Sequence, residues 1–339
     1  STLTLTRTPR YIRTVALINA TYFKLELFIF TGVIGSKPAT ATYTINKDII
    51  NSEEEVTFEI NQLVRDYYTT GQSLWVIADI TGFTASTVIT PVSTTFLAFD
   101  GFNYYQEPTA AGGSINATYT YPILLSADKF QVLNTDFAQI PINAEIAERV
   151  DFKLNGVVVS THIITDNGNT NQKIQHIITT ASNVDEVDVI YNSGASTQTK
   201  TIELIDECKF PVSKIQFINK LGALQNLYFF KKSVETLDVK KDNFQRNILD
   251  ATLPYAVGFK FTEHQIKDYN IIGNESLVLN SGFVSESMND SFKELLLSQY
   301  VWVVRSGATL PVNVISSNLT YKTGLNDRLI NYTINFKYA

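Results

Sequence analysis

The chain has 339 residues, more than one hydrophobic core usually serves, and we expect three domains. Twenty-seven basic and 33 acidic residues give a net charge of −6, which excludes a protein that neutralises nucleic-acid phosphates with its whole surface. Cys208 is the single cysteine, so no disulfide can form within the chain, and folding in a reducing cytoplasm fits this composition.

The most apolar stretch, residues 14–35, is predicted to hold a strand and not a membrane helix. Lys24 and Glu26 lie well inside it, and a charge at the centre of a bilayer costs about 2.5–3.5 kcal/mol. Alternation with a period of two places four apolar residues on one side of a half-buried strand: Phe23, Leu25, Leu27 and Ile29. No basic segment followed by an apolar run opens the sequence, and we expect that an initiator Met was trimmed before Ser1.

The first domain is predicted to be a β-sandwich of residues 1–112. Period-two alternation predicts further strands at residues 42–45, 56–60 and 74–80. Residues 61–68 change to a helical spacing, with one shared face made of Ile60, Leu63, Val64 and Tyr67. Residues 106–114 are rich in Pro, Gly and Ala and are predicted to form a turn and a linker.

The second domain, residues 113–206, is predicted to be an immunoglobulin-like or related small β-sandwich. Its strongest signal is Asn155-Gly156 between alternating runs at 150–154 and 157–164, which predicts a β-hairpin. Residues 166–169 and 192–194 are predicted to be further turns.

The third domain, residues 207–339, is predicted to be β-rich with one amphipathic helix at 285–298. Ser285 is the expected cap of this helix, and its apolar stripe is Met288, Phe292, Leu295 and Leu296. Strands are predicted at 213–218, 228–230, 301–305, 312–315, 319–323 and 330–338. The expected fold class is therefore mainly β: multi-domain β-sandwiches with a C-terminal α+β domain.

Residues suited to catalysis or metal binding are sparse, and we predict no catalytic, cofactor-binding or metal site. The three histidines, His162, His176 and His264, are far apart and lack a matching Cys or carboxylate spacing. Residues 166–169 resemble half of a calcium loop but lack the later bidentate Glu, so a hairpin turn is the favoured interpretation. Residues 53–55 are three consecutive Glu, which we interpret as a solvated acidic edge.

Two further groups have both a functional and a structural interpretation. Tyr104, Tyr105 and Trp302 are candidates for stacking on sugars, although aromatic residues of β-proteins more often belong to cores or interfaces. The region 208–247 carries an excess of Lys and is a candidate basic patch, although solvated strand faces and hairpin turns are the favoured interpretation.

The last third of the chain also resembles a known family. Residues 208–223, which contain Phe217-Ile218-Asn219-Lys220-Leu221-Gly222, and then residues 227–231, resemble a "Phe-Leu-Asn-basic-x-Gly" strand and turn. This pattern is similar to virion proteins of tailed bacteriophages that infect Bacteroidetes, including crAss-like and flavobacterial phages. Residues 281–284, 293–298, 301–303, 311–312 and 325–332 extend the resemblance, as do residues 24–32, 38–47 and 58–67.

This resemblance covers about half of the chain and implies a structural protein of the virion, such as a baseplate, tail or tail-tip component that assembles as a ring. The implied partners are copies of the chain, meeting head to tail, and other tail proteins. No membrane or nucleic acid is expected as a partner. The implied location is the tail of the virion, after assembly in the cytoplasm of the host bacterium.

Two alternatives stay open. The first is a receptor- or carbohydrate-binding module of the same particle, which contacts a host surface glycan through Tyr104, Tyr105 or Trp302 in a concavity. The second is a hydrolase of a surface polysaccharide, which needs two carboxylates about 5–9 Å apart in a cleft.

Overall fold

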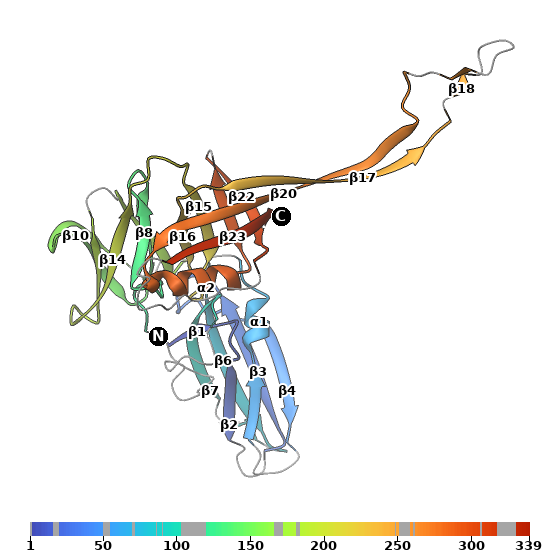
Figure 1. Cartoon of the computed structure of the whole chain (residues 1–339). Helices are drawn as coiled ribbons and strands as arrows, with labels where there is room; N and C mark the ends of the chain where they lie inside the picture. Colours follow the sequence, from blue (N-terminus) through green and yellow to red (C-terminus); the bar gives the residue numbers. More distant parts are fainter. Residues whose placement is uncertain are drawn as a thin grey trace.

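A computed structural model of the chain describes residues 2–15, 20–49, 55–69, 72–85, 87–89, 91–102, 120–165, 172–180, 184–247, 249–250, 258–259, 262–305, 307–316 and 330–339. The protein is mainly β, with 60% strand and 6% helix, which confirms the predicted fold class. Figure 1 shows a body built from several sheets, from which one narrow ribbon projects far outward.

The first sheet contains the predicted half-buried strand at its centre. Its order is β1 (Thr2–Leu5), β7 (Val92–Phe99), β6 (Ser73–Phe83), β3 (Tyr22–Phe30) and β4 (Tyr43–Asp48). One face packs against the helix α1 (Asn61–Arg65) and a two-stranded sheet of β2 (Tyr11–Val15) and β5 (Glu55–Glu59). The alternation predicted for β3 is confirmed, because Phe23, Leu25, Leu27 and Ile29 all belong to this core.

The second group of strands forms a small sandwich. Its five-stranded sheet has the order β11 (Val157–Ile163), β10 (Ala147–Leu154), β13 (Glu186–Tyr191), β14 (Ser196–Ile205) and β8 (Lys129–Leu133). Its core also includes residues of a two-stranded sheet of β9 (Phe137–Asn143) and β12 (Ile174–Thr180). The predicted hairpin is confirmed: Asn155 and Gly156, at φ 51° and 78°, join β10 to β11 with the positive φ that a tight hairpin turn requires.

The third sheet curls around the C-terminal helix. Its order is β16 (Leu224–Phe229), β15 (Ser213–Ile218), β21 (Val301–Arg305), β22 (Ala308–Val314), β23 (Ile330–Tyr338), β20 (Ile266–Val284) and β17 (Val234–Gln245). The helix α2 (Asn289–Leu297) contributes Phe292 and Leu295 to the core of this sheet. The rings of Phe229 on β16 and Phe336 on β23 lie 5.9 Å apart, which shows how strongly the sheet is curved.

The predicted C-terminal helix exists, but its beginning differs from the prediction. A 3₁₀ turn, η3 (Glu286–Met288), precedes α2, so the α-helix proper starts at Asn289. Ser285 occupies the predicted N-cap position, now of the 3₁₀ turn, but its side chain makes no capping hydrogen bond, and Ser287 Oγ donates to its hydroxyl instead. In α1, Ile60 and Val64 are buried as predicted, whereas Tyr67 lies outside the apolar face and is 46% exposed.

The ribbon in Figure 1, which we call the arm, is formed by the antiparallel strands β17 and β20. The inner half of β20 pairs with β23 inside the third sheet, from Ser276 to Val284. The outer half of β20 pairs with β17 alone among the described residues. Two short strands, β18 (Leu249–Asp250) and β19 (Gly258–Phe259), pair with each other beyond it, and Figure 1 places β18 near the tip.

The three sheets share a core. The second face of the first sheet is apolar and buried, and it meets residues from both other groups of strands. The cluster contains Leu3, Leu5, Phe28, Phe30, Trp75, Ile77, Leu97 and Phe99 of the first sheet, with Leu124, Ile174, Leu221 and Ala223. The body is therefore held together by apolar burial between the sheets as well as within them. The division at residues 112 and 206 stays a prediction, and the first of these boundaries lies outside the described residues.

The turn singled out by the family resemblance lies at this junction. Asn219 is 1% exposed, and its Oδ1 accepts hydrogen bonds from the backbone N–H groups of Leu221 (3.0 Å) and Ala223 (3.1 Å). Its Nδ2 donates to the carbonyl of Leu124 at 2.7 Å, on the chain segment that leads into the second sandwich. Gly222 has φ +81°, and a Cβ there would lie 3.0 Å from the backbone of Asp100. Through these hydrogen bonds and this close packing, the turn connects the three groups of strands.

Candidate assembly interface

The predicted aromatic site is only partly within the described residues. Tyr104 and Tyr105 lie outside them. Trp302 lies on β21, half-buried, and its ring stacks on that of Tyr300 with centroids 6.2 Å apart and an interplanar angle of 11°. Trp302 lines neither of the two hollows described below. Glycan stacking therefore stays a prediction, as does polysaccharide hydrolysis.

The histidines of the second sandwich lie on different sheets. His162 is on β11 and contacts the ring of Phe152 edge-on, whereas His176 is on β12 with Nε2 3.3 Å from the carbonyl oxygen of Leu224. Burial lowers the pKa of His176. In the described part of the chain, no group of three or more His, Cys, Asp or Glu is arranged to hold a metal ion. Residues 53–54 and 166–169, two of the weighed candidates, lie outside that part.

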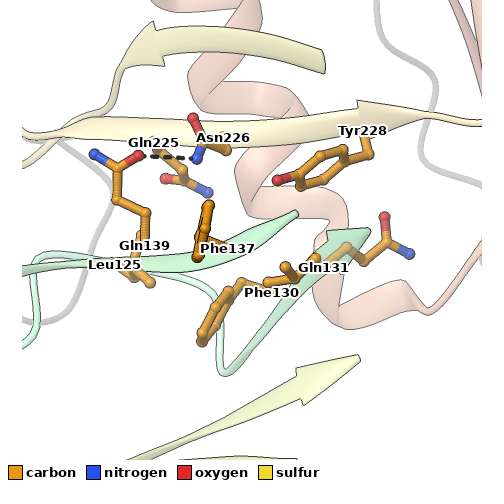
Figure 2. Close-up of a pocket in the computed structure, with 9 residues that line it drawn as sticks. Leu125, Phe130, Gln131, Phe137, Gln139, Gln225, Asn226 and Tyr228 are labelled. Carbon is orange, nitrogen blue, oxygen red and sulfur yellow. Dashed lines mark hydrogen bonds between the residues drawn. The ribbon is translucent and has the colours of Figure 1, made fainter. Parts of the chain in front are cut away.

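The body has one narrow cavity between its second and third sheets (Figure 2). Its volume is about 10 Å³, room for roughly one water molecule, so it is far too small for a substrate. Figure 2 shows Phe137 between the two sides and a hydrogen bond from Asn226 to Gln139, 3.2 Å long. This region acts as a contact between sheets.

A partly buried polar cluster lies beside this cavity. Asp136 accepts hydrogen bonds from Lys214 Nζ at 2.7 Å and from Tyr228 Oη at 2.8 Å. Although burial acts in the opposite direction, the hydrogen bond from Lys214 and the one from Tyr228 together lower the pKa of Asp136. Burial raises the pKa of Tyr228. Both donors belong to the third sheet and Asp136 to the second sandwich, so the charged pair fixes one against the other.

The arm differs from every other part of the third sheet in its exposure. All twelve residues of β17 and the first eight residues of β20 are exposed. Eight large apolar side chains of these two strands are between 46% and 62% exposed: Val234, Leu237, Val239, Phe244, Ile266, Tyr269, Ile271 and Ile272. An isolated two-stranded hairpin is at best marginally stable in water, and exposed apolar patches mark interaction sites. The arm is therefore the candidate interface.

A shallow hollow lies at the base of the arm. Its volume is about 610 Å³, and it is lined by residues of both arm strands and of the C-terminal strand: Leu237, Gly273, Asn274, Glu275, Asn313, Lys337, Tyr338 and Ala339. Tyr338 packs partly against the core of the third sheet. The hollow therefore joins the exposed apolar side chains of the arm to the edge of the buried core.

Four of the eight basic residues in the candidate basic patch at 208–247 form ion pairs with acidic side chains. Lys214 pairs with Asp136, Lys231 with Glu207, Lys241 with Asp268 and Arg246 with Glu263. The favoured interpretation, solvated strand faces, agrees with the full exposure of β17. These pairs lie mainly on the surface, where each contributes about 0–1 kcal/mol, so they balance charge more than they stabilise the fold.

The arm was not predicted from the sequence, and no strand or helix was expected between residues 231 and 280. Structureless loops longer than about 12–15 residues are uncommon in compact domains, so the length of this unassigned region was a signal that could have revealed the arm. The alternation that predicts strands elsewhere is weak in β17, because Val234, Leu237 and Val239 do not keep a period of two.

No protein-family model matches the chain, and no curated protein matches its sequence. Among solved structures, those with some similarity include the periplasmic chaperone SfaE (TM-score 0.20), the E. coli chaperone DraB (0.21) and the CsuC–CsuE chaperone–tip adhesion subunit complex of Acinetobacter baumannii (0.22). Each is 8% identical and covers 58–60% of this chain and 92–93% of its own. Superpositions at these TM-scores carry no argument about the function of this chain. No described helix is long and apolar enough to cross a bilayer.

Proposed function

We propose that this chain is a structural subunit of a larger assembly, in which it binds partner subunits through its arm. The assembly is the tail, baseplate or tail tip of a tailed phage, as the sequence resemblance implies, and it forms in the host cytoplasm. The partners are copies of the chain and other tail proteins. The observation that best supports this proposal is the arm, a projecting two-stranded ribbon whose exposed side chains are apolar at eight positions.

Two physical arguments support this proposal. The outer part of the arm adds nothing to the core of the body, because all of β17 and the first eight residues of β20 are exposed. An ordered ribbon of this kind gains its apolar burial only from a partner. In the body, by contrast, three sheets contribute to one shared core, so the body can hold the base of the arm rigidly. A long ribbon on a firm body is suited to reaching a neighbouring subunit.

The experiment is to remove the arm without disturbing the body. Glu235 and Leu277 face each other across the two strands, so an Asn-Gly turn can join them directly and replace residues 236–276. Leu277, which is fully buried, and the ion pair between Glu235 and Arg305 are kept. The matched control replaces Leu237, Val239 and Ile271 by Ser and leaves the backbone of the arm in place.

The full chain is expected to form oligomers, or to join its tail partners, in sedimentation and electron microscopy. The armless chain is expected to stay monomeric with an unchanged melting temperature, and the serine control to be weakened. Cryo-electron microscopy of the particle should then show the chain as a symmetric ring. The proposal is wrong if the armless chain assembles as the full chain does, or if the protein is absent from every virion.

A further inference from the structure

Near the base of the arm, one face carries Leu237, Val239 and Gly273 together with two exposed glutamates, Glu235 and Glu275. Cross-strand partners share a face, so Leu237 lies beside Glu275, and Val239 beside Gly273. Alternation along β20 places these residues on the same face as Leu277, which is fully buried in the third core. The opposite face carries Thr236, Asp238, Asn274 and Ser276. That face of the core therefore continues outward beyond the cover that the body provides.

Farther out, the arm ends in an aromatic pair. The rings of Phe244 and Tyr269 lie 5.9 Å apart at an interplanar angle of 61°, and the two side chains are 46% and 53% exposed. Aromatic side chains bury large areas and are frequent anchors of interfaces. The arm thus exposes aliphatic side chains near the body and aromatic side chains near the outer end of the pairing between β17 and β20.

A second uncovered apolar feature lies in the second sandwich. β11 is the terminal strand of its sheet, and apart from His162 it contains no ionisable side chain. Val157, Val158, Val159 and Ile163 are between 47% and 73% exposed. Natural edge strands are usually protected by charges or by being very short, as in β4, where Lys47 and Asp48 are exposed. β11 has no such charge. A register shift in its pairing with β10 leaves Val159 as a bulged residue, and in the described part of the chain β10 is the only strand that pairs with β11, so its outer edge has no strand partner there.

These two features cannot cover each other within one chain. In Figure 1 the sheet that contains β10 lies at one end of the molecule, and the arm projects from the opposite side. β11 pairs with β10, so its free edge faces away from the arm. Twelve residues of strand extend about 40 Å, so the arm reaches well beyond its own body.

We infer that the free edge of β11 receives the arm of a second copy of this chain, which adds to the sheet as a strand. This inference rests on the proposed function and names its partner surface. Pairing between two arms would leave β11 uncovered, whereas arm-to-edge pairing covers the seven residues of β11 and a matching length of one arm strand. Such contacts are head to tail and close into a ring when the rotation permits.

A crosslinking experiment tests the pairing. In a Cys208→Ser background, one variant carries Val239→Cys on the arm, and a second carries Val159→Cys on the edge. A short bis-maleimide tolerates an unknown strand register, and mass spectrometry identifies the joined peptides. The matched control is Thr44→Cys on the protected edge strand β4, where Thr44 is exposed.

A crosslinked dimer is expected when the two variants are mixed and not with either variant alone. Mixing Val239→Cys with Thr44→Cys is expected to give at least tenfold less product. The inference is overturned if Val239→Cys crosslinks to itself as fast as in the mixture, since the arms then pair with each other. It is equally overturned if the mixture gives no product.

A charge on the edge separates this inference from the proposed function. Val159 is 50% exposed, so Val159→Lys should leave the body folded while blocking an added strand. We expect it to weaken self-association at least tenfold, as removal of the arm does. If Val159→Lys assembles normally and the armless chain does not, the inference fails and the proposed function stands. If both assemble normally, both fail.

Discussion

Two leucines show how differently the body and the arm are built. Leu221 lies at the junction of the three sheets and is 1% exposed, whereas Leu237 lies on the arm and is 59% exposed. Both belong to the C-terminal third of the chain, and both sit in well-formed β-structure or its turns. The body uses its apolar residues to hold its own sheets together. The arm keeps its apolar residues exposed, as the proposed binding of a neighbouring subunit requires.

The strongest test of this difference between the body and the arm is the same substitution at these two positions. Leu221→Ala is expected to lower the free energy of unfolding by about 2–5 kcal/mol, because it leaves a cavity in the shared core. Leu237→Ala is expected to change it by less than about 0.5 kcal/mol, because the side chain is solvated. Urea denaturation of the monomer measures both. Equal effects at the two positions would mean that the arm folds back onto the body in solution.

The pH dependence of the free energy of unfolding gives a second test of the junction between the three sheets. Glu294 on α2 is 1% exposed, and its Oε2 accepts a hydrogen bond from the backbone N–H of Lys220 at 3.2 Å. Burial raises the pKa of Glu294 to about 7. The folded state therefore holds this proton more tightly than the unfolded state, whose Glu titrates near about 4.3.

The contribution of Glu294 to stability should consequently fall as the pH rises from about 4.5 to 7, by up to about 1.4 kcal/mol per pH unit, and then level off. Glu294→Gln should remove this slope because the amide does not titrate. The measurement is the urea midpoint of both proteins at several pH values. Parallel pH profiles of the two proteins would show that Glu294 stays charged in the folded state.

A smaller loss is expected from Asn219→Ala. The substitution leaves the buried N–H groups of Leu221 and Ala223 and the carbonyl of Leu124 without their side-chain partner. We expect a loss of about 1–3 kcal/mol in the free energy of unfolding, with no effect on arm-mediated assembly. The matched control is the exposed Asn46→Ala on β4, for which the change should stay within about 0.5 kcal/mol. A loss of assembly at unchanged stability would contradict the structural role assigned to this turn.

The sequence predicts several elements of the body, mainly those whose residues alternate between a buried and an exposed face, whereas strands such as β8, β9, β13 and β14 were not assigned. The alternation around Phe23 and Leu25 reports a strand with one face in a core, and Asn155-Gly156 reports a turn that needs positive φ. The predicted strand at residues 213–218 agrees in both bounds with β15. Local pattern and tertiary environment agree at these positions, which is why the prediction succeeds.

There are physical reasons why the arm and the shared core could not be predicted from the sequence. A ribbon that leaves the body has no buried face, so burial does not impose an alternating pattern on Val234, Leu237 and Val239. The shared core depends on which sheet faces meet, and sequence periodicity carries no such information. One hint was present: Leu74 to Ala78 form a continuous apolar run in β6, as expected of a strand that is buried on both faces.

In a ring of the kind proposed, the bulge in the arm would set the ring size. Pairing between β17 and β20 shifts register between Lys240 and Asp242, opposite Asn270, whose φ is +50°. Such an irregularity bends a ribbon and increases its local twist. When each copy holds the next by its arm, this bend sets the rotation from one copy to its neighbour. The number of copies that complete a circle is then fixed by the conformation of a few residues far from the body, and a one-residue deletion there should yield rings of a different symmetry.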